Sequence, residues 1–122
     1  TSANNNREHG GFIRSGNVIR ANDGPVGSPK TDQDISIEIN SRQGESTFHS
    51  HPSGIYYEQA NPNQIGRGSE TYFWLNAPSP QDIQNASATS YVFARRERKV
   101  YVYNNSGILG TIPQKYFVGF KQ

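Results

Sequence analysis

Residues 91–110 read YVFARRERKVYVYNNSGILG, and this stretch decides the fold class. The apolar run Tyr91–Ala94 predicts a buried strand, and the charged residues Arg95–Lys99 predict a turn after it. Val100–Tyr103 then predicts the returning strand and Asn104–Gly107 a second hairpin turn, before a last strand over the apolar residues that follow. The C-terminal part of the chain is therefore expected to consist of strands joined by hairpins.

A short helix is predicted directly before these strands, beginning at Ser79. Ser79 is a good N-cap, Pro80 suits the first helical position, and Asp82 places an acid in the first turn, where the helix dipole favours it. Ile83 and the alanines after it continue the helix weakly to about Thr89. The chain is thus expected to be an α+β domain, and an all-β architecture stays open if this helix stands alone.

The N-terminal half carries weaker signals. Gly10–Arg20 predicts a β-hairpin around Ser15-Gly16-Asn17, and Ser46–His49 predicts another strand. Ile35–Ile39 alternates isoleucine with polar residues, which predicts a half-buried strand with its isoleucines inward. Residues 55–78 show no sustained period and are predicted to be an insertion loop, partly held by aromatic side chains.

The composition limits the size, the core and the chemistry of any site. A chain of 122 residues fits a single domain, 1–122, and its hydrophobic fraction of 32% predicts a small, aromatic-rich core. The absence of cysteine excludes a disulfide scaffold, a thiolate zinc site and a cysteine nucleophile. A net charge of +2 and the lack of a long apolar run lead us to expect neither nucleic-acid binding nor membrane insertion. Because the sequence begins at Thr1, we expect a processed product or a fragment of a longer chain.

Three separated segments carry residue types that suit a metal site. His49 and His51 lie two residues apart, so in a strand both imidazoles point to one face and can reach one cation such as Zn²⁺. Ser79-Pro80-Gln81-Asp82 is by itself a common helix start. Glu8-His9-Gly10-Gly11 can be an ordinary strand end, although its glycines allow another backbone or a metal-bound group to approach closely. Taken singly, each segment also fits an ordinary structural role.

In this order, Glu8, His49-Ser50-His51-Pro52 and Ser79-Pro80-Gln81-Asp82 resemble the JAMM (JAB/MPN) metallopeptidase pattern. That pattern is a glutamate at an early strand, a His-Ser/Thr-His pair followed by proline, and a Ser-x-x-Asp that begins a helix. The resemblance implies a JAB/MPN-like (cytidine-deaminase-like) mixed sheet. One departure is the spacer 52–78, whose 27 residues stand where the family commonly has a short linker.

The resemblance also implies a function and a role for each residue. The function is that of a zinc-dependent peptidase or isopeptidase, which hydrolyses an amide bond with a metal-activated water. Zn²⁺ would be held by His49, His51 and Asp82. Glu8 would accept the water proton and return it to the leaving amine, and Ser79 would donate a hydrogen bond to the oxyanion. His9 is a less favoured alternative ligand.

Within that superfamily, Arg7–Gly11 and the hairpin Lys99–Gly107 are similar to the JAB-like domains at the ends of bacterial polymorphic and Rhs-type toxins. The similarity implies a protein or peptide substrate, a carrier chain or an immunity protein as partner, and a secreted or delivered effector domain, with a cytoplasmic location as the alternative. Two other functions stay open: a catalytically silent JAB-like binding module and a metal-dependent nuclease toxin. The weak basicity argues against the nuclease.

Overall fold

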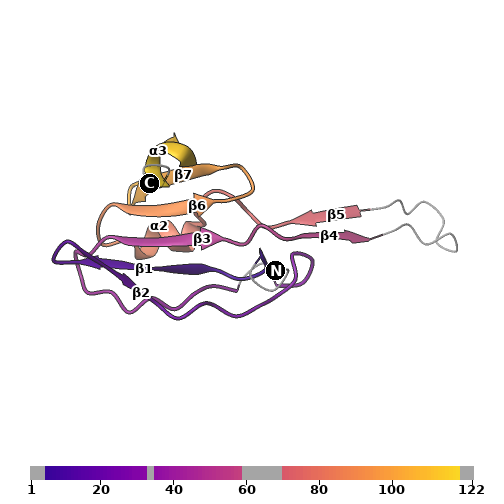
Figure 1. The fold of residues 1–122 in the computed structure, drawn as a ribbon, viewed down its shortest axis with the longest axis horizontal. Coiled ribbons are helices and arrows are strands. Elements are labelled where there is room, and N and C mark those ends of the chain that lie inside the picture. The colour runs from indigo at the N-terminus through magenta and orange to yellow at the C-terminus, as the bar shows by residue number, and fades with distance from the viewer. Residues whose placement is uncertain (1–4, 33–34, 59–69, 119–122) are drawn as a thin grey trace, which may run out of the picture.

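A six-stranded sheet forms the body of the molecule in the computed structural model, which describes residues 5–32, 35–58 and 70–118 (Figure 1). The elements are β1 (His9–Arg14), β2 (Asn17–Arg20), β3 (Thr47–His51), β4 (Ile55–Glu58), β5 (Glu70–Phe73), α2 (Pro80–Asn85), β6 (Ser90–Ala94), β7 (Lys99–Asn104), β8 (Gly107–Pro113) and α3 (Gln114–Val118). The strand order is β2-β1-β3-β6-β7-β8. Strands β3 and β6 run parallel, and the other neighbours run antiparallel, so the sheet is mixed.

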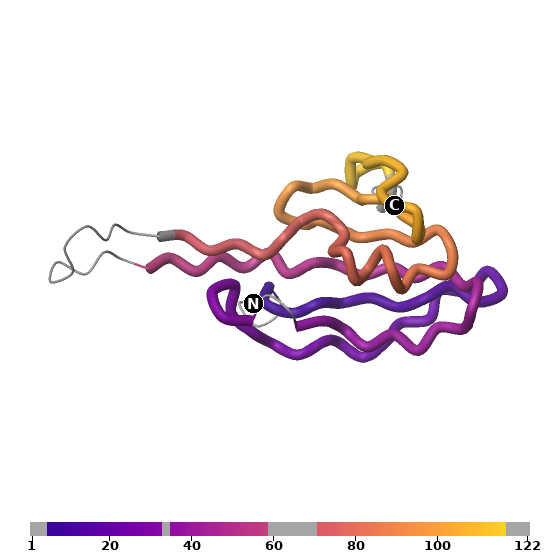
Figure 2. The backbone as a smooth tube through the Cα atoms, turned by 180° about the vertical axis from the view of Figure 1, so that it is seen from behind, coloured from indigo at the N-terminus to yellow at the C-terminus, as the bar shows by residue number. Residues whose placement is uncertain are grey.

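The parallel pair explains where α2 lies. Parallel neighbours cannot be joined by a tight turn and need a crossover of about a dozen residues or more. Residues 52–89 make this crossover from β3 to β6 and contain β4, β5 and α2. Figures 1 and 2 show α2 on one side of the sheet, next to β3 and β6. The crossover thereby brings the start of α2 to the face of β3 that carries the two paired histidines.

The predicted start of α2 is confirmed, but its predicted end is wrong. Ser79 is the N-cap, Pro80 is the first helical residue, and Ser79 and Asp82 form a capping box. The helix ends at Asn85 instead of about Thr89, because Ala86 is already extended. No residue of α2 is buried, so tertiary packing does not hold further turns in place.

The predicted hairpins at both ends of the sheet are confirmed. Strands β1 and β2 meet at Ser15 and Gly16, whose φ angles of 52° and 78° are those a tight two-residue hairpin turn requires. Strands β6, β7 and β8 pair in succession, as the sequence 91–110 predicts. The helix α3 was not predicted.

The strand predicted at Ile35–Ile39 is absent, although its isoleucines do face inward. Ile35, Ile37 and Ile39 are half-buried, and the residues between them are exposed. The amide of Ile37 donates to the carboxylate of Glu8 rather than to a neighbouring strand. An extended chain covered on one side shows the same period of two as a strand, and Ile35–Ser41 forms one wall of a cleft.

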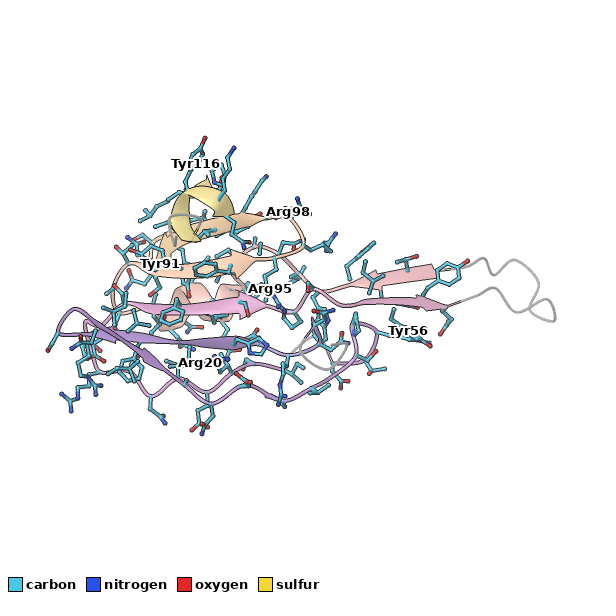
Figure 3. All side chains as sticks on the ribbon, in the orientation of Figure 1. Arg20, Tyr56, Tyr91, Arg95, Arg98 and Tyr116 are labelled. Carbon is cyan, nitrogen blue, oxygen red and sulfur yellow. The ribbon has the colours of Figure 1, made fainter. Side chains whose placement is uncertain are left out.

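Regular structure also occurs within 55–78, where none was predicted. Strands β4 and β5 pair antiparallel in a sheet of their own and form an arm that projects from the body (Figure 1). The rings of Tyr56 and Tyr72 face each other across the arm at 5.9 Å, and Figure 3 labels Tyr56 there. Trp74, at the base of the arm, is only 3% exposed and donates to the Asn6 side chain. The middle of the predicted loop, 59–69, lies outside the described residues.

The core is small, as the composition predicts. Among the described residues its buried apolar members are Phe12, Trp74, Val92, Ala94, Val100 and Tyr103. Nearly as many buried residues are polar or charged, and three of them are Glu8, His49 and His51. No helix in the described part of the chain has the length and apolar character that a membrane crossing requires. Ionisable side chains are rarely buried in so small a domain, and the three buried here lie close together.

Candidate metal centre

Strand β3 supplies the two imidazoles. His49 and His51 alternate with Ser50, so both side chains point to the face of the sheet on which α2 lies. Their ring centroids are 5.1 Å apart, and the residues are 5% and 6% exposed. The parallel pairing with β6 fixes this part of β3 from one side, and the antiparallel pairing with β1 fixes it from the other.

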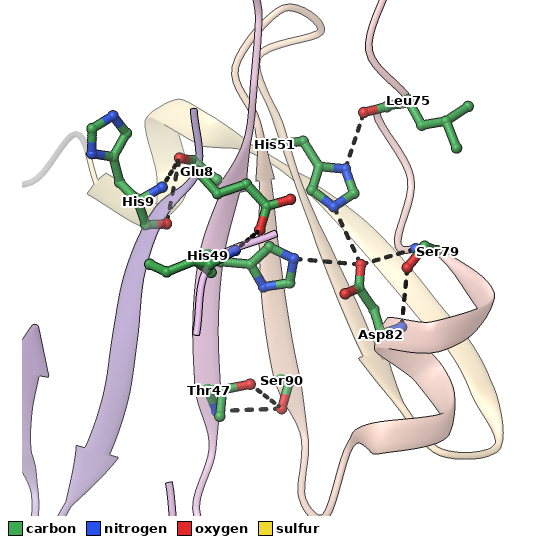
Figure 4. Close-up of polar contacts among 11 residues, drawn as sticks. Glu8, His9, Thr47, His49, His51, Leu75, Ser79, Asp82 and Ser90 are labelled. Atoms are coloured by element: carbon green, nitrogen blue, oxygen red, sulfur yellow. Dashed lines mark hydrogen bonds and ion pairs between the residues drawn. The ribbon is translucent and has the colours of Figure 1, made fainter. Parts of the chain in front are cut away.

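The start of α2 supplies a carboxylate that meets both rings (Figure 4). One oxygen of Asp82, Oδ2, lies 3.2 Å from Nε2 of His51 and 3.4 Å from Nε2 of His49. The same oxygen accepts a hydrogen bond from the amide of Ser79 at 2.9 Å, and the amide of Asp82 donates to Oγ of Ser79. The capping box therefore orients the acid toward the histidines.

Glu8 completes the cluster from the residue just before β1. It is 7% exposed, and its Oε1 accepts a hydrogen bond from the amide of Ile37 at 3.1 Å. Ligand atoms of Glu8, His49 and His51 all lie within 4.8 Å of one another. The register that places Gly10 opposite His49 brings Glu8 to this position.

The surroundings shift the pKa values of these groups in different directions. Burial raises the pKa of Glu8, although the nearby His49 and His51 oppose this effect. Burial alone would also raise the pKa of Asp82, but its contacts with the two histidines and the Ser79 amide lower the pKa well below the usual range. Burial would lower the pKa of His51, yet Asp82 and Glu8 raise it overall. Glu8 is thus the carboxylate better suited to take up a proton.

The contacts of His51 match its raised pKa. Its Nδ1 lies 3.0 Å from the carbonyl oxygen of Leu75, and its Nε2 lies 3.2 Å from Asp82. Both partners accept hydrogen bonds, so the imidazolium form satisfies them together. If Nδ1 keeps its proton for Leu75, Nε2 is the nitrogen that presents a lone pair to a cation.

The donor set fits a divalent metal ion. His49 Nε2 is a buried nitrogen with no hydrogen-bond partner, since its contact with Asp82 at 3.4 Å lacks hydrogen-bond geometry. Buried polar atoms without partners are rare and call for an explanation such as an ion. Two imidazole nitrogens with nearby carboxylates are the ligand types that Zn²⁺ takes, and similar sets also bind other transition metals.

All five residues expected from the sequence come together in one cleft of about 520 Å³, which Glu8, His49, His51, Ser79 and Asp82 help to line. His9 does not join them, because its Nδ1 lies 2.8 Å from Asp23 outside the cleft. Sequence reasoning missed the Ile37 amide and the Leu75 carbonyl. No residue type encodes these backbone contacts, so the sequence carries no signal for them.

Compared with protein-family models, curated proteins and solved structures, the chain matches none of them. The structure itself establishes a small α+β domain with a mixed sheet and few helices, and within it a Glu/His/His group that could hold a metal ion.

Proposed function

We propose that this chain is a zinc-dependent peptidase or isopeptidase of the JAMM type, with a JAB/MPN-like fold. One observation carries the proposal. The Nε2 atoms of His49 and His51 meet one oxygen of Asp82 at 3.4 and 3.2 Å, beside the buried carboxylate of Glu8. The motif order in the sequence and the mixed sheet support the same proposal.

His49, His51 and Asp82 would hold the metal, and Glu8 lies beside them. Zn²⁺ bound there would supply a Lewis acid and lower the pKa of a water molecule toward ~7. Glu8 takes the proton of the attacking water and returns it to the leaving nitrogen, a role that its buried position beside the two imidazoles supports. The amide of Ile37 holds Glu8 in position during this exchange.

Ser79 would assist on the other side of the cleft. Its Oγ accepts a hydrogen bond from the amide of Asp82, which leaves its hydroxyl hydrogen for another acceptor. Ser79 lines the cleft, so this hydrogen can be donated to the oxygen of the scissile carbonyl as negative charge develops there.

The biological setting follows from the toxin-like motifs alone. We propose a secreted or delivered effector domain that acts on a protein or peptide and associates with a carrier chain or an immunity protein. The segments Arg7–Gly11 and Lys99–Gly107 support this setting.

Zinc content and hydrolysis, measured on the same variants, test the proposal. We expect one zinc per chain, with cleavage of an internally quenched peptide library or a ubiquitin chain that a chelator stops. His49→Ala should lose both zinc and activity. Glu8→Gln should keep zinc and lose turnover by ~10²–10⁴-fold, the usual contribution of a general acid–base group. His9→Ala, which alters the neighbouring histidine outside the cleft, should keep both.

Two results would contradict these roles. If the chain binds no zinc at micromolar concentration, the metal site is wrong. If Glu8→Gln cleaves at the original rate, Glu8 is not the proton acceptor. Loss of zinc in Glu8→Gln would instead make Glu8 a ligand, as its place among the three clustered residues allows.

A further inference from the structure

The cleft extends to both sides of the candidate metal ligands along β3. Thr47, His49 and His51 alternate with residues of the other face and line the cleft together. At ~3.3 Å per residue, the floor from Thr47 to His51 is about 13 Å long. A strand-like ligand of about four residues matches this length, with the candidate metal site between its ends.

The end of the cleft at Thr47 is polar but uncharged. Thr47 Oγ1 donates to Ser90 Oγ at 3.2 Å (Figure 4). Ser90 Oγ in turn donates to the carbonyl of Ala88. Tyr103, 2% exposed, also lines the cleft. Asn85 adds an amide group to the lining of the cleft, and Ala86 and Ile39 add small apolar surfaces to it. Hydroxyl and amide groups without a formal charge suit a small hydrogen-bonding side chain.

The end at His51 is apolar. Pro52, Trp74 and Leu75 line it, and the Leu75 residue is 64% exposed. Because Trp74 donates its Nε1 hydrogen to Asn6, the indole's only donor is already used. Ile35, Ile37 and Ile39 also line the cleft and add apolar surface to it. A ligand side chain at this end therefore meets hydrocarbon.

The ionisable groups of the cleft argue against a ligand whose chain terminus lies inside the cleft. Among the described residues that line it, no lysine or arginine occurs, and the carboxyl groups are those of Glu8 and Asp82. A free C-terminal carboxylate needs a cationic partner when it leaves water. The charged and metal-binding groups belong to the central cluster, and neither end of the cleft, at Thr47 or at Leu75, offers a charged partner for a terminal carboxylate or a terminal amino group. We therefore expect a bound chain to continue beyond the cleft rather than end in it.

From these features we infer that the cleft binds an internal, extended peptide segment, with an apolar residue at the His51 end and a small hydrogen-bonding residue such as serine at the Thr47 end. This inference rests on the proposed peptidase function, because that function is the reason for taking the ligand to be a peptide. It goes further by naming the substrate as an internal site with an apolar residue on one side.

Trp74 gives a readout that does not depend on turnover, because it is the single tryptophan of the chain and lines the cleft. The probe is an acetylated and amidated octapeptide with central Leu-Ser residues, titrated into the metal-free protein while tryptophan fluorescence is followed. A matched peptide has aspartate in place of leucine. We expect the leucine peptide to bind at least about tenfold more tightly, the gain from burying one leucine side chain.

Two exposed leucines provide matched variants. Leu75→Asp should remove most of the preference for the leucine peptide. Leu109→Asp, which changes a residue 58% exposed on β8 and outside the cleft, should leave it unchanged. Equal affinities of the two peptides for the wild-type chain, or equal effects of the two variants, would overturn the inference. So would tighter binding of the same peptide with a free carboxylate directly after serine.

Zinc-loaded protein separates this inference from the proposed function. If the loaded chain cleaves peptides but shows no preference between the leucine and aspartate probes, the inference fails and the hydrolase stands. If the preference in fluorescence is present but no peptide or isopeptide is cleaved, the peptidase proposal fails and the groove for an internal segment stands.

Discussion

At the scale of single residues, four ionisable side chains lie largely buried beside one another at the bottom of the cleft. Glu8, His49 and His51 are each less than 9% exposed, and the side chain of Asp82 is 20% exposed. Removing charges from water is costly unless each charge is well paired. In the structure the histidines and Asp82 pair with one another, but His49 Nε2 keeps no hydrogen bond. A divalent cation would satisfy this nitrogen and balance the carboxylates together.

Zinc should therefore raise the thermal stability, and Asp82→Asn should remove most of that gain. A ligand that binds only the native state at 100 times its Kd adds ~2.7 kcal/mol to the free energy of unfolding. Asparagine at position 82 can still accept a hydrogen bond from the Ser79 amide and so keep the helix cap, but it lacks the negative charge of aspartate. Changing a residue that only hydrogen-bonds a metal ligand typically lowers metal affinity ~10–100-fold. Because Asp82 is proposed to bind the metal itself, we expect Asp82→Asn to lower zinc affinity by more than this.

Melting temperatures with zinc and with a chelator would measure this effect. Asp23→Asn is the control, because Asp23 contacts His9 outside the cleft. A zinc-induced rise in Asp82→Asn equal to that of the wild type would show that Asp82 does not hold the metal.

At the scale of elements, β1 depends on two glycines that let its neighbours approach. A Cβ at Gly10 would meet the carbonyl oxygen of Phe48 on β3, and one at Gly11 would meet the carbonyl oxygen of Ile19 on β2. The sequence left open whether these glycines admit a backbone or a metal-bound group. The structure assigns both of them to backbone contacts within the sheet.

Gly10→Ala should destabilise the protein by about 1–3 kcal/mol, the usual cost of forcing extra atoms into a packed site. Urea denaturation measures the free energy of unfolding. The control is Gly110→Ala in β8, where an added Cβ meets nothing within 4 Å. Equal effects of the two substitutions would show that the close approach of β1 to β3 is not what limits this position.

A second element-scale contact links the end of β1 to the turn before β3. Arg14 donates to both carboxylate oxygens of Glu45, at 2.6 and 3.0 Å, and the amide of Arg42 donates to the same carboxylate. The Arg14 hydrogen bond lowers the pKa of Glu45. A carboxyl group whose folded pKa is lowered adds stability above its unfolded pKa and loses it as the pH falls through the folded pKa.

Glu45→Gln should therefore lower the melting temperature at pH 7, and the difference from wild type should shrink below about pH 4.5 and vanish at lower pH. Thermal melts across pH 2–7 would show this convergence. Glu38→Gln, at an exposed glutamate of the segment Ile35–Ser41, serves as the control for the loss of one surface charge. A constant difference at every pH would mean that the ionisation of Glu45 adds nothing.

Elements with local signals were predictable, and elements that depend on distant partners were not. The cap at Ser79 and the turn at Ser15-Gly16 are fixed by neighbouring residues, so the sequence places both correctly. Ile35–Ile39 shows the alternation of a strand, but a strand also needs a neighbour to pair with, which the pattern does not contain. The pairing of β4 with β5 was not predicted for the same reason, because their residues, apolar Ile55 and Phe73 included, show no alternation of apolar and polar side chains.

At the scale of the whole molecule, the site depends on topology. Glu8, His49 and Asp82 are separated by 41 and 33 positions in the sequence. The antiparallel β1–β3 pair and the crossover between β3 and β6 bring them together. The sequence could suggest this convergence only through a resemblance, since residue types carry no distances. The contacts from Ile37 and Leu75 needed the folded backbone.

The arm formed by β4 and β5 is a sheet separate from the six-stranded body. Shortening the arm tests whether the metal site depends on it. Its strands pair only with each other, and none of the candidate ligands lies on them. Tyr57 and Thr71 are opposite partners, so an Asn-Gly turn can join them in place of residues 58–70. The change removes the ion pair between Lys30 and Glu58, and such surface pairs contribute ~0–1 kcal/mol.

We expect the shortened chain to keep its zinc content and to lose at most about 1 kcal/mol of stability. Trp74→Ala is the contrast at the base of the arm, where the buried indole contacts Asn6, and it should cost ~3–5 kcal/mol. Denaturation curves and zinc analysis of both variants give the comparison. If the shortened chain unfolds as readily as Trp74→Ala or loses its zinc, the arm supports the cleft instead of extending from it. Full retention would place the determinants of the metal site in the six-stranded body and the 74–86 segment, and leave the exposed Ile55 and Tyr57 available for contacts outside the chain.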